Sequence, residues 1–220
     1  MQMLRDWLAA VPLWDTLSRR RKVKRLARRY WAWKREGGDL PMPHYGKQLV
    51  LLDYARRFGL SVLVETGTYT GHTVTAMLDR FDEVYSIELD PELCRKAQQR
   101  FARYRHVHIL EGSSEARLPE VLEREQRPCL FWLDAHYSQG CTAKGDLETP
   151  IMIELEHILR HPLAGDHVLL IDDARCFTGE GDYPALSSVR DKILAAHPTW
   201  TFAVEDDIIR AHRTPEAVSG

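Results

Sequence analysis

Short apolar runs alternate with amphipathic stretches from about residue 45 to residue 212. The runs are rich in Val, Ile and Leu, as is typical of strands that are buried on both faces of a sheet. The amphipathic stretches have helical spacing and are bounded by Gly, Pro, Ser or Asp. The predicted strands cover residues 61–65, 83–88, 107–110, 129–133, 167–171, 200–204 and 208–212, and the predicted helices end near residues 58, 80, 103, 124, 160 and 196.

This alternation predicts an α/β fold with a doubly wound, Rossmann-like sheet of seven strands, most of them parallel. The last two strands are linked only by Glu205, Asp206 and Asp207, so we expect a C-terminal antiparallel hairpin. A chain of 220 residues suffices for one such domain and is too short for two ordinary ones. We therefore divide it into a basic, Trp-rich helical extension, residues 1–44, and an α/β domain, residues 45–220.

The extension differs from the domain in charge. Residues 1–36 contain 11 Lys and Arg against 3 Asp and Glu, a net charge of +8, whereas the whole chain has a net charge of −2. Four of the six tryptophans lie among these cations. This composition suits a helical cover over the domain or a homodimer contact, an anionic membrane surface, or, as the least favoured partner, nucleic acid.

From the sequence pattern we expect neither a membrane span nor a signal peptide. No uncharged run approaches the roughly 20 residues of a membrane span. Arg5, Asp6 and Asp15 interrupt any signal-peptide core. The four cysteines form no C-x-x-C pair, which favours free thiols in a reducing compartment. We expect a cytoplasmic protein, peripheral to the membrane if the extension binds lipid.

The loop after the first strand, ETGTYTG, carries the first candidate site. Ligands of doubly wound sheets bind beyond the carboxyl ends of the strands, and glycines there let the backbone turn sharply and approach a bound molecule. The G-x-x-x-G spacing differs from the G-x-G-x-x-G of dinucleotide binders and argues against an NAD-dependent oxidoreductase. The candidate ligand-binding residues are Glu65, Gly67, Thr68, Tyr69, Gly71 and Thr73.

The next two strands also end in polar residues. Glu88 lies 21 residues after Gly67, where a carboxylate can accept hydrogen bonds from both hydroxyls of a ribose. The alternative is a solvated acid at a strand end. The turn Gly112-Ser113-Ser114 follows the third strand and is suited to bound an adenine ring, although a plain helix cap accounts for Ser114 equally well.

Three carboxylates close the fourth and fifth strands, namely Asp134 and the pair Asp172 and Asp173. Like charges at close range raise one another's pKa, and a hard divalent cation with oxygen ligands relieves that cost. Such a site favours Mg²⁺, Ca²⁺ or Mn²⁺ over zinc. The alternative is that Arg175 or a nearby Lys neutralises the carboxylates.

With these motifs, the chain from about residue 60 to residue 213 resembles class I S-adenosylmethionine-dependent methyltransferases. ETGTYTG resembles the first motif of that family, and YSIELD resembles the second, with Glu88 in the ribose position. FWLDAH and VLLIDD resemble metal-dependent O-methyltransferases of the catechol and macrocin (sugar) types. The resemblance implies S-adenosyl-L-methionine as cofactor, held by the three loops and Asp134, and Mg²⁺ held by Asp134, Asp172 and Asp173. The implied reaction is methyl transfer to a hydroxyl of a small molecule or sugar.

The proton acceptor departs from that resemblance. Sugar-type relatives carry a second Asp two residues after the first, where this chain has His136, and catechol-type relatives carry a nearby Lys. Imidazole can accept a proton near neutral pH, so His136 is one candidate base and Lys144 is the other. His136 as a plain hydrogen-bonding residue of the loop is the alternative. We expect residues 135–149 to act as a mobile lid.

Other functions remain open at this point. These are a methyltransferase with a nitrogen or nucleic-acid acceptor, and a non-methylating binding domain on the same fold. The fourth strand ends in LDAH and carries no Asp/Asn-Pro-Pro-Tyr motif of amino-methylating enzymes.

Overall fold

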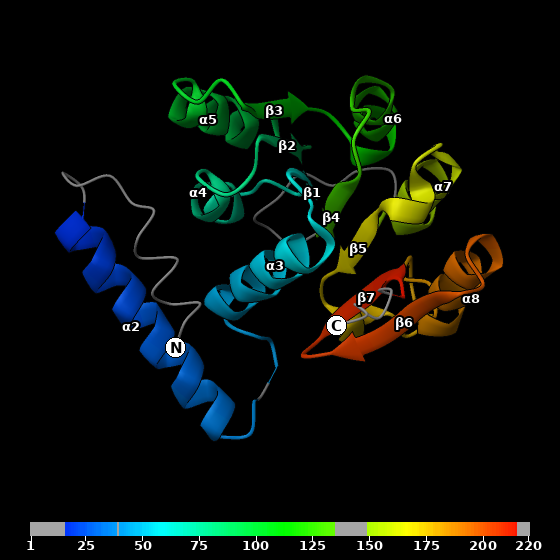
Figure 1. The fold of residues 1–220 in the computed structure, drawn as a ribbon, viewed down its shortest axis with the longest axis horizontal. Coiled ribbons are helices and arrows are strands. Elements are labelled where there is room, and N and C mark those ends of the chain that lie inside the picture. The colour runs from blue at the N-terminus through cyan, green and yellow to red at the C-terminus, as the bar shows by residue number, and fades with distance from the viewer. Residues whose placement is uncertain (1–15, 39, 135–148, 215–220) are drawn as a thin grey trace, which may run out of the picture.

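A seven-stranded sheet crosses the centre of the molecule (Figure 1). The computed structural model describes residues 16–38, 40–134 and 149–214. The strand order is β3-β2-β1-β4-β5-β7-β6; β7 is antiparallel to both of its neighbours, and the other pairs are parallel. The strands are β1 (Val62–Thr66), β2 (Glu83–Glu88), β3 (Val107–Glu111), β4 (Cys129–Leu133), β5 (Val168–Ile171), β6 (Trp200–Glu205) and β7 (Ile208–Arg213). The predicted fold class is confirmed, and each strand boundary lies within one residue of its prediction.

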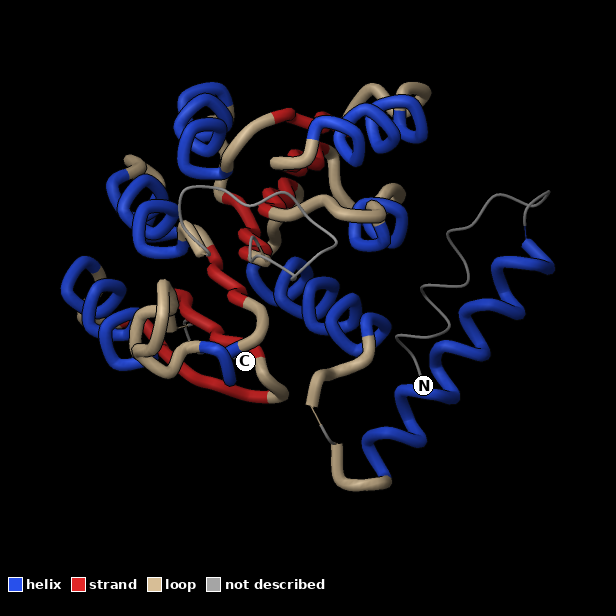
Figure 2. Tube along the Cα trace, turned by 180° about the vertical axis from the view of Figure 1, so that it is seen from behind, coloured by secondary structure: helices blue, strands red, loops and turns tan. Residues whose placement is uncertain are grey.

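Helices cover both faces of this sheet (Figures 1 and 2). One face packs against α3 (His44–Phe58), α4 (His72–Met77) and α5 (Pro91–Phe101), and the other against α6 (Ser114–Arg124), α7 (Ile151–Arg160) and α8 (Leu186–Ala196). Successive residues of a strand point to opposite faces, so β4 supplies Leu130 and Trp132 to the first core and Phe131 to the second. Burial on both faces accounts for the continuous apolar runs.

The C-terminal hairpin has a two-residue turn. Asp206 and Asp207 have φ values of 52° and 66°, so both lie in the left-handed region, as a type I′ turn requires. Its right-handed twist matches that of the flanking strands β6 and β7. Asp207 is also buried, and its Oδ1 accepts a hydrogen bond from the backbone N–H of Arg175 at 2.8 Å. The turn therefore joins the hairpin to the segment that follows β5.

Several helix ends differ from their predictions. The helix predicted over residues 47–58 begins at His44, and α4 ends at Met77 instead of near residue 80. Asp90 caps α5, because its side chain accepts the backbone N–H groups of residues 92 and 93. The cap predicted at Ser114 is wrong: Ser113 holds the N-cap position without a side-chain bond, and Ser114 is buried.

The extension contributes α2 (Thr16–Arg35), which packs on α3. Val23, Ala27 and Tyr30 are buried against Tyr45 at the start of α3. A Cβ at Gly46 would lie 2.7 Å from Cε2 of Tyr30, so only glycine allows this close approach. No helix in the described ranges is both long and apolar enough to cross a membrane. The division of the chain at residues 44 and 45 stays a prediction.

Candidate functional site

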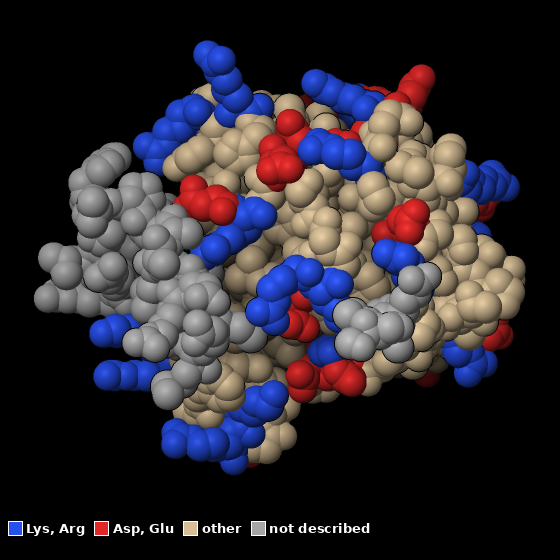
Figure 3. Space-filling view, in the orientation of Figure 1, with Lys and Arg blue, Asp and Glu red and all other residues tan. Residues whose placement is uncertain are grey.

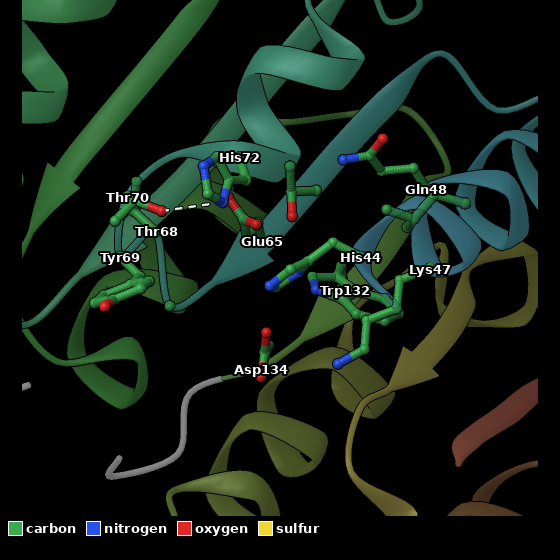
Figure 4. Close-up of a pocket in the computed structure, with 13 residues that line it drawn as sticks. His44, Lys47, Gln48, Glu65, Thr68, Tyr69, Thr70, His72, Trp132 and Asp134 are labelled. Atoms are coloured by element: carbon green, nitrogen blue, oxygen red, sulfur yellow. Dashed lines mark hydrogen bonds between the residues drawn. The ribbon is translucent and has the colours of Figure 1, made fainter. Parts of the chain in front are cut away.

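The loop between β1 and α4 forms one wall of a pocket at the carboxyl ends of β1 and β4 (Figure 4). Gly67 and Gly71 have φ values of 90° and 66°, which explains the two glycines of the motif. The N–H groups of Gly67 and Thr68 donate to the carbonyl of Ile87 at 2.9 and 3.1 Å and fix the loop to β2. Five of the six candidate residues of this loop line the pocket; Gly71, the sixth, stands at the N-cap of α4.

Glu65 is buried at the back of this pocket. The Ser86 hydroxyl donates to its Oε2 at 2.6 Å. Burial raises the pKa of Glu65 to about 8, although the hydroxyls of Ser86 and Thr73 act to lower it. Glu65 therefore holds its proton at neutral pH in the free protein.

The protonated state of Glu65 predicts a pH-dependent stability. The pKa is raised from 4.5 to about 8 on folding, so the stabilisation is complete below about pH 4.5 and is lost as the pH rises towards 8. We expect the free energy of unfolding to fall across this range, with a slope from Glu65 of up to about 1.4 kcal/mol per pH unit. Glu65→Gln, which is neutral at every pH, should flatten the profile in urea unfolding. Parallel profiles for the two proteins would contradict this assignment.

Glu88 joins the loops that follow β1, β2 and β3. Its Oε2 accepts the backbone N–H of Tyr69 at 2.6 Å, and its Oε1 accepts that of Asp90 at 2.9 Å. The N–H of Gly112 donates to the Glu88 carbonyl at 2.9 Å. Glu88 is thus held beside the first loop. The roles of Glu88 in ribose binding and of Gly112, Ser113 and Ser114 around an adenine stay predictions.

Asp134 stands directly after β4, beside the end of β1. Its N–H donates to the carbonyl of Thr66 at 3.1 Å. The carboxylates of Asp134, Asp172 and Asp173 converge, with one oxygen from each within 4.8 Å of the others. The structure therefore brings together the three residues that the sequence proposes as metal ligands. An all-oxygen donor set of this kind suits Mg²⁺.

Two cations contact this carboxylate cluster. The ammonium of Lys47 pairs with Oδ2 of Asp172 and lies 3.8 Å from Oδ1 of Asp173. Arg175 donates to Oδ1 of Asp173 at 2.8 Å and also pairs with Asp207. Arg175, which the sequence offered as an alternative to a metal, is therefore in place, and the lysine of the cluster is Lys47, which comes from α3 and was not identified from the sequence.

Burial and the neighbouring charges set the ionisation of the Lys47–Asp172 pair. Burial, followed by the charge of Asp134, raises the pKa of Asp172, while Lys47 opposes that rise. Burial alone would lower the pKa of Lys47, but the surrounding carboxylates raise it above its ordinary value. A divalent ion bound to these carboxylate oxygens would be repelled by the neighbouring Lys47 ammonium. The donor set fits a cation provided that Lys47 moves away from Asp172.

One face of α3 forms the opposite wall of the pocket, and the sequence analysis missed it. His44, Lys47, Gln48 and Leu51 line the cavity at the spacing i, i+3, i+4 and i+7. Figure 4 shows His44 and Lys47 extending from α3 towards the side of the pocket that holds Asp134. The ring of His44 also faces that of His72, with 5.8 Å between centroids. These polar residues have helical spacing in the segment directly before the first strand, and that pattern could have predicted a helix face at the site.

A second pocket lies on the other side of Asp134. Its walls come from α7 and from the segment after β5, and include Glu154, Phe177 and Tyr183. Burial raises the pKa of Glu154 to about 7, against the lowering effect of the Ser114 and Thr66 hydroxyls. Asp134 lines both pockets, the one walled by the loop after β1 and the one that contains the Asp172–Asp173 pair.

The two candidate bases, His136 and Lys144, lie outside the described residues, as does nearly all of the predicted lid 135–149. Their roles stay predictions.

The chain has the fold of solved methyltransferases. It is similar to an SAH-bound methyltransferase from Podospora anserina, PaMTH1, at 15% identity and a TM-score of 0.53 over 93% of this chain and 98% of that one. It is also similar to an O-methyltransferase from Bacillus cereus in complex with SAH, at 14% identity and a TM-score of 0.53 over 87% and 90% of the two chains.

A methyltransferase with a different acceptor atom is also similar to this chain. The N-methyltransferase NodS from Bradyrhizobium japonicum has 16% identity and a TM-score of 0.51 over 79% of this chain and 97% of that one. No protein-family model matches the chain, and no curated protein matches it in sequence. At such low identities the likeness establishes the fold, and function must be argued from the site.

Proposed function

We propose that the protein is an S-adenosyl-L-methionine-dependent O-methyltransferase acting on a hydroxyl of a small molecule or sugar, with assistance from a divalent cation. The position of Asp134 carries this proposal. This carboxylate forms the boundary between the pocket walled by the loop after β1 and the pocket that contains the acidic pair. A group held at Asp134 is therefore within reach of ligands in both pockets.

The first pocket provides the cofactor site in this proposal. The loop from Glu65 to Thr73 would hold the methionine part of the cofactor, and Glu88 would face its ribose. The two glycines give the loop the close backbone approach that such a ligand needs. Glu65 is neutral when the pocket is empty, so burying it there costs less than burying a charge.

The second pocket provides the acceptor site. Phe177 and Tyr183 supply ring surface there, and the acidic pair lines the same pocket. Asp134, Asp172 and Asp173 would hold Mg²⁺, which would lower the pKa of the acceptor hydroxyl. In the transfer, the acceptor oxygen forms a bond to the methyl carbon, the bond from that carbon to sulfur breaks, and the hydroxyl proton passes to a base.

We assign His44, one of the two histidines that line the first pocket, to receive that proton, alongside His136 and Lys144. Its side chain reaches from α3 into the space facing Asp134 (Figure 4). Imidazole is a common general base in enzymes that work near neutral pH.

Calorimetry and transfer assays test the proposal together. We expect the full chain to bind S-adenosylhomocysteine and not NAD. Radiolabelled S-adenosylmethionine should then methylate hydroxyl acceptors of a sugar and phenol panel, with a rate that falls in chelator and recovers with Mg²⁺. Failure to bind S-adenosylhomocysteine would overturn the assignment, and transfer to amines alone would replace the hydroxyl acceptor. An undiminished rate in chelator would remove the cation from the proposal.

A further inference from the structure

The helix α2 has two faces of opposite character. Its 20 residues include no Asp or Glu. The inner face packs on α3 through Val23, Ala27 and Tyr30. The outer face is exposed and carries five cations in two adjacent rows at helical spacing, with one tryptophan in the first row. We call this outer face the basic face; it consists of Lys24, Arg28, Trp31 and Arg35 in one row and of Arg25 and Arg29 in the other.

The cations of the basic face have no acidic partner among the described residues. The exposed acids of the domain, by contrast, are often paired by their own helices, as in Glu92 with Lys96 and Glu156 with Arg160. Within the described residues, the basic face therefore has unmatched positive charge. Such a face fits an external anionic partner.

The shape of the basic face favours a flat partner. A helix of 20 residues is about 30 Å long. The helix α2 lies at the margin of the molecule, on the outer side of α3 (Figure 1). Figure 3 shows Lys and Arg side chains in this lower-left part of the surface. A straight helix at the margin of the molecule can contact a planar surface along its whole length.

Trp31 supports a lipid surface in particular. Its side chain is 55% exposed, although its neighbour Tyr30 is buried. An indole exposed in a row of cations is well placed for the headgroup level of a bilayer, where amphipathic rings partition. Binding to single-stranded nucleic acid relies on several stacking rings along a groove, and the described part of the basic face offers one ring on a convex surface.

We infer that the basic face of α2 binds anionic membrane surfaces and holds the domain at the lipid headgroups. The apolar face of the helix stays packed on α3, so the contact is made by cations and Trp31 without unfolding the extension from the domain. The other wall of α3 lines the candidate active site, which places that site close to the membrane. This inference does not depend on the proposed reaction.

Vesicle co-sedimentation of the full chain tests this inference. We expect binding to phosphatidylcholine vesicles that contain about one third phosphatidylglycerol, little binding to pure phosphatidylcholine, and loss of binding in about 0.5 M NaCl. The variant R25Q/R28Q/R29Q should lose on the order of a hundredfold in partition coefficient, since each cation contributes about fivefold. W31A should lose less.

A matched control separates the basic face from overall charge. The variant R95Q/K96Q/R105Q removes three exposed cations from around α5 and should bind within about threefold of wild type. Gln is a good helix former, so circular dichroism should match; R25K/R28K/R29K keeps the charge and should keep the binding. Equal losses in the two Gln variants, or loss in the Lys variant, would overturn the inference. Tighter binding to a single-stranded oligonucleotide that displaces the vesicles would also overturn it.

Discussion

Asp134→Asn is expected to lower the rate of methyl transfer on the order of a hundredfold to a thousandfold. The carboxylate lies at the boundary of the two pockets and converges with Asp172 and Asp173, so its charge acts where the acceptor hydroxyl must lose its proton. Asn has almost the same shape and keeps one oxygen, but removes the charge. Affinity for S-adenosylhomocysteine should fall by no more than about tenfold, because the variant changes one contact of the cofactor. Single-turnover transfer and calorimetry measure the two quantities separately.

The control for this variant is Asp191→Asn. Asp191 is an exposed carboxylate on α8 that pairs only locally with Arg190, and its loss should leave the rate unchanged. A full rate in Asp134→Asn would show that the carboxylate cluster takes no part in transfer. Equal losses of rate and of cofactor affinity would restrict Asp134 to cofactor binding.

Lys47→Met is expected to tighten Mn²⁺ binding by about a hundredfold or more. The Lys47 ammonium pairs with Asp172 inside a cluster of three carboxylates, where a divalent ion would bind. Removing one partner of a buried ion pair costs roughly 3–5 kcal/mol because a charge is left uncompensated, and a bound cation would relieve that cost. The variant should therefore be less stable than wild type without metal and should recover on adding Mn²⁺. Electron paramagnetic resonance and thermal unfolding measure the two effects.

Lys96→Met serves as the control, because this exposed lysine of α5 pairs with Glu92 far from the cluster and should leave Mn²⁺ binding unchanged. Equal Mn²⁺ affinities in wild type and Lys47→Met would show that Lys47 does not compete for the cation. If neither protein binds Mn²⁺, cation assistance fails, and the binding of S-adenosylhomocysteine tests the cofactor site separately.

The fold was predictable because each strand is a short apolar run with turn residues at both ends. CLFWL, for example, is buried on both faces of the sheet, so its continuous apolar composition is enough to predict a strand there. The hairpin was predictable for a similar local reason, since two adjacent Asp residues tolerate the left-handed conformation of a tight turn. Helix boundaries were less well predicted, at the start of α3 and at the end of α4, because packing decides where the first and last turns form.

The candidate site was predictable as far as it depends on strand ends. Residues at the carboxyl ends of adjacent parallel strands must lie at one edge of the sheet, which brings Glu65, Glu88, Asp134, Asp172 and Asp173 to the same region. The sequence by itself therefore determined the strands and helices in their order along the chain, and the gathering of acidic residues at the carboxyl edge of the sheet.

Only the tertiary structure decided what faces that edge. Lys47 is 125 residues from Asp172 along the chain, and no local pattern predicts that the two are paired. The same holds for Arg175 and Asp207, which meet because the hairpin folds back beside β5. The two faces of α2 were likewise decided by packing, since helical periodicity places Tyr30 and Trp31 on different sides but only α3 determines which side is covered. Strand ends are positioned by hydrogen bonding within the sheet, whereas these contacts depend on how separate helices pack on it.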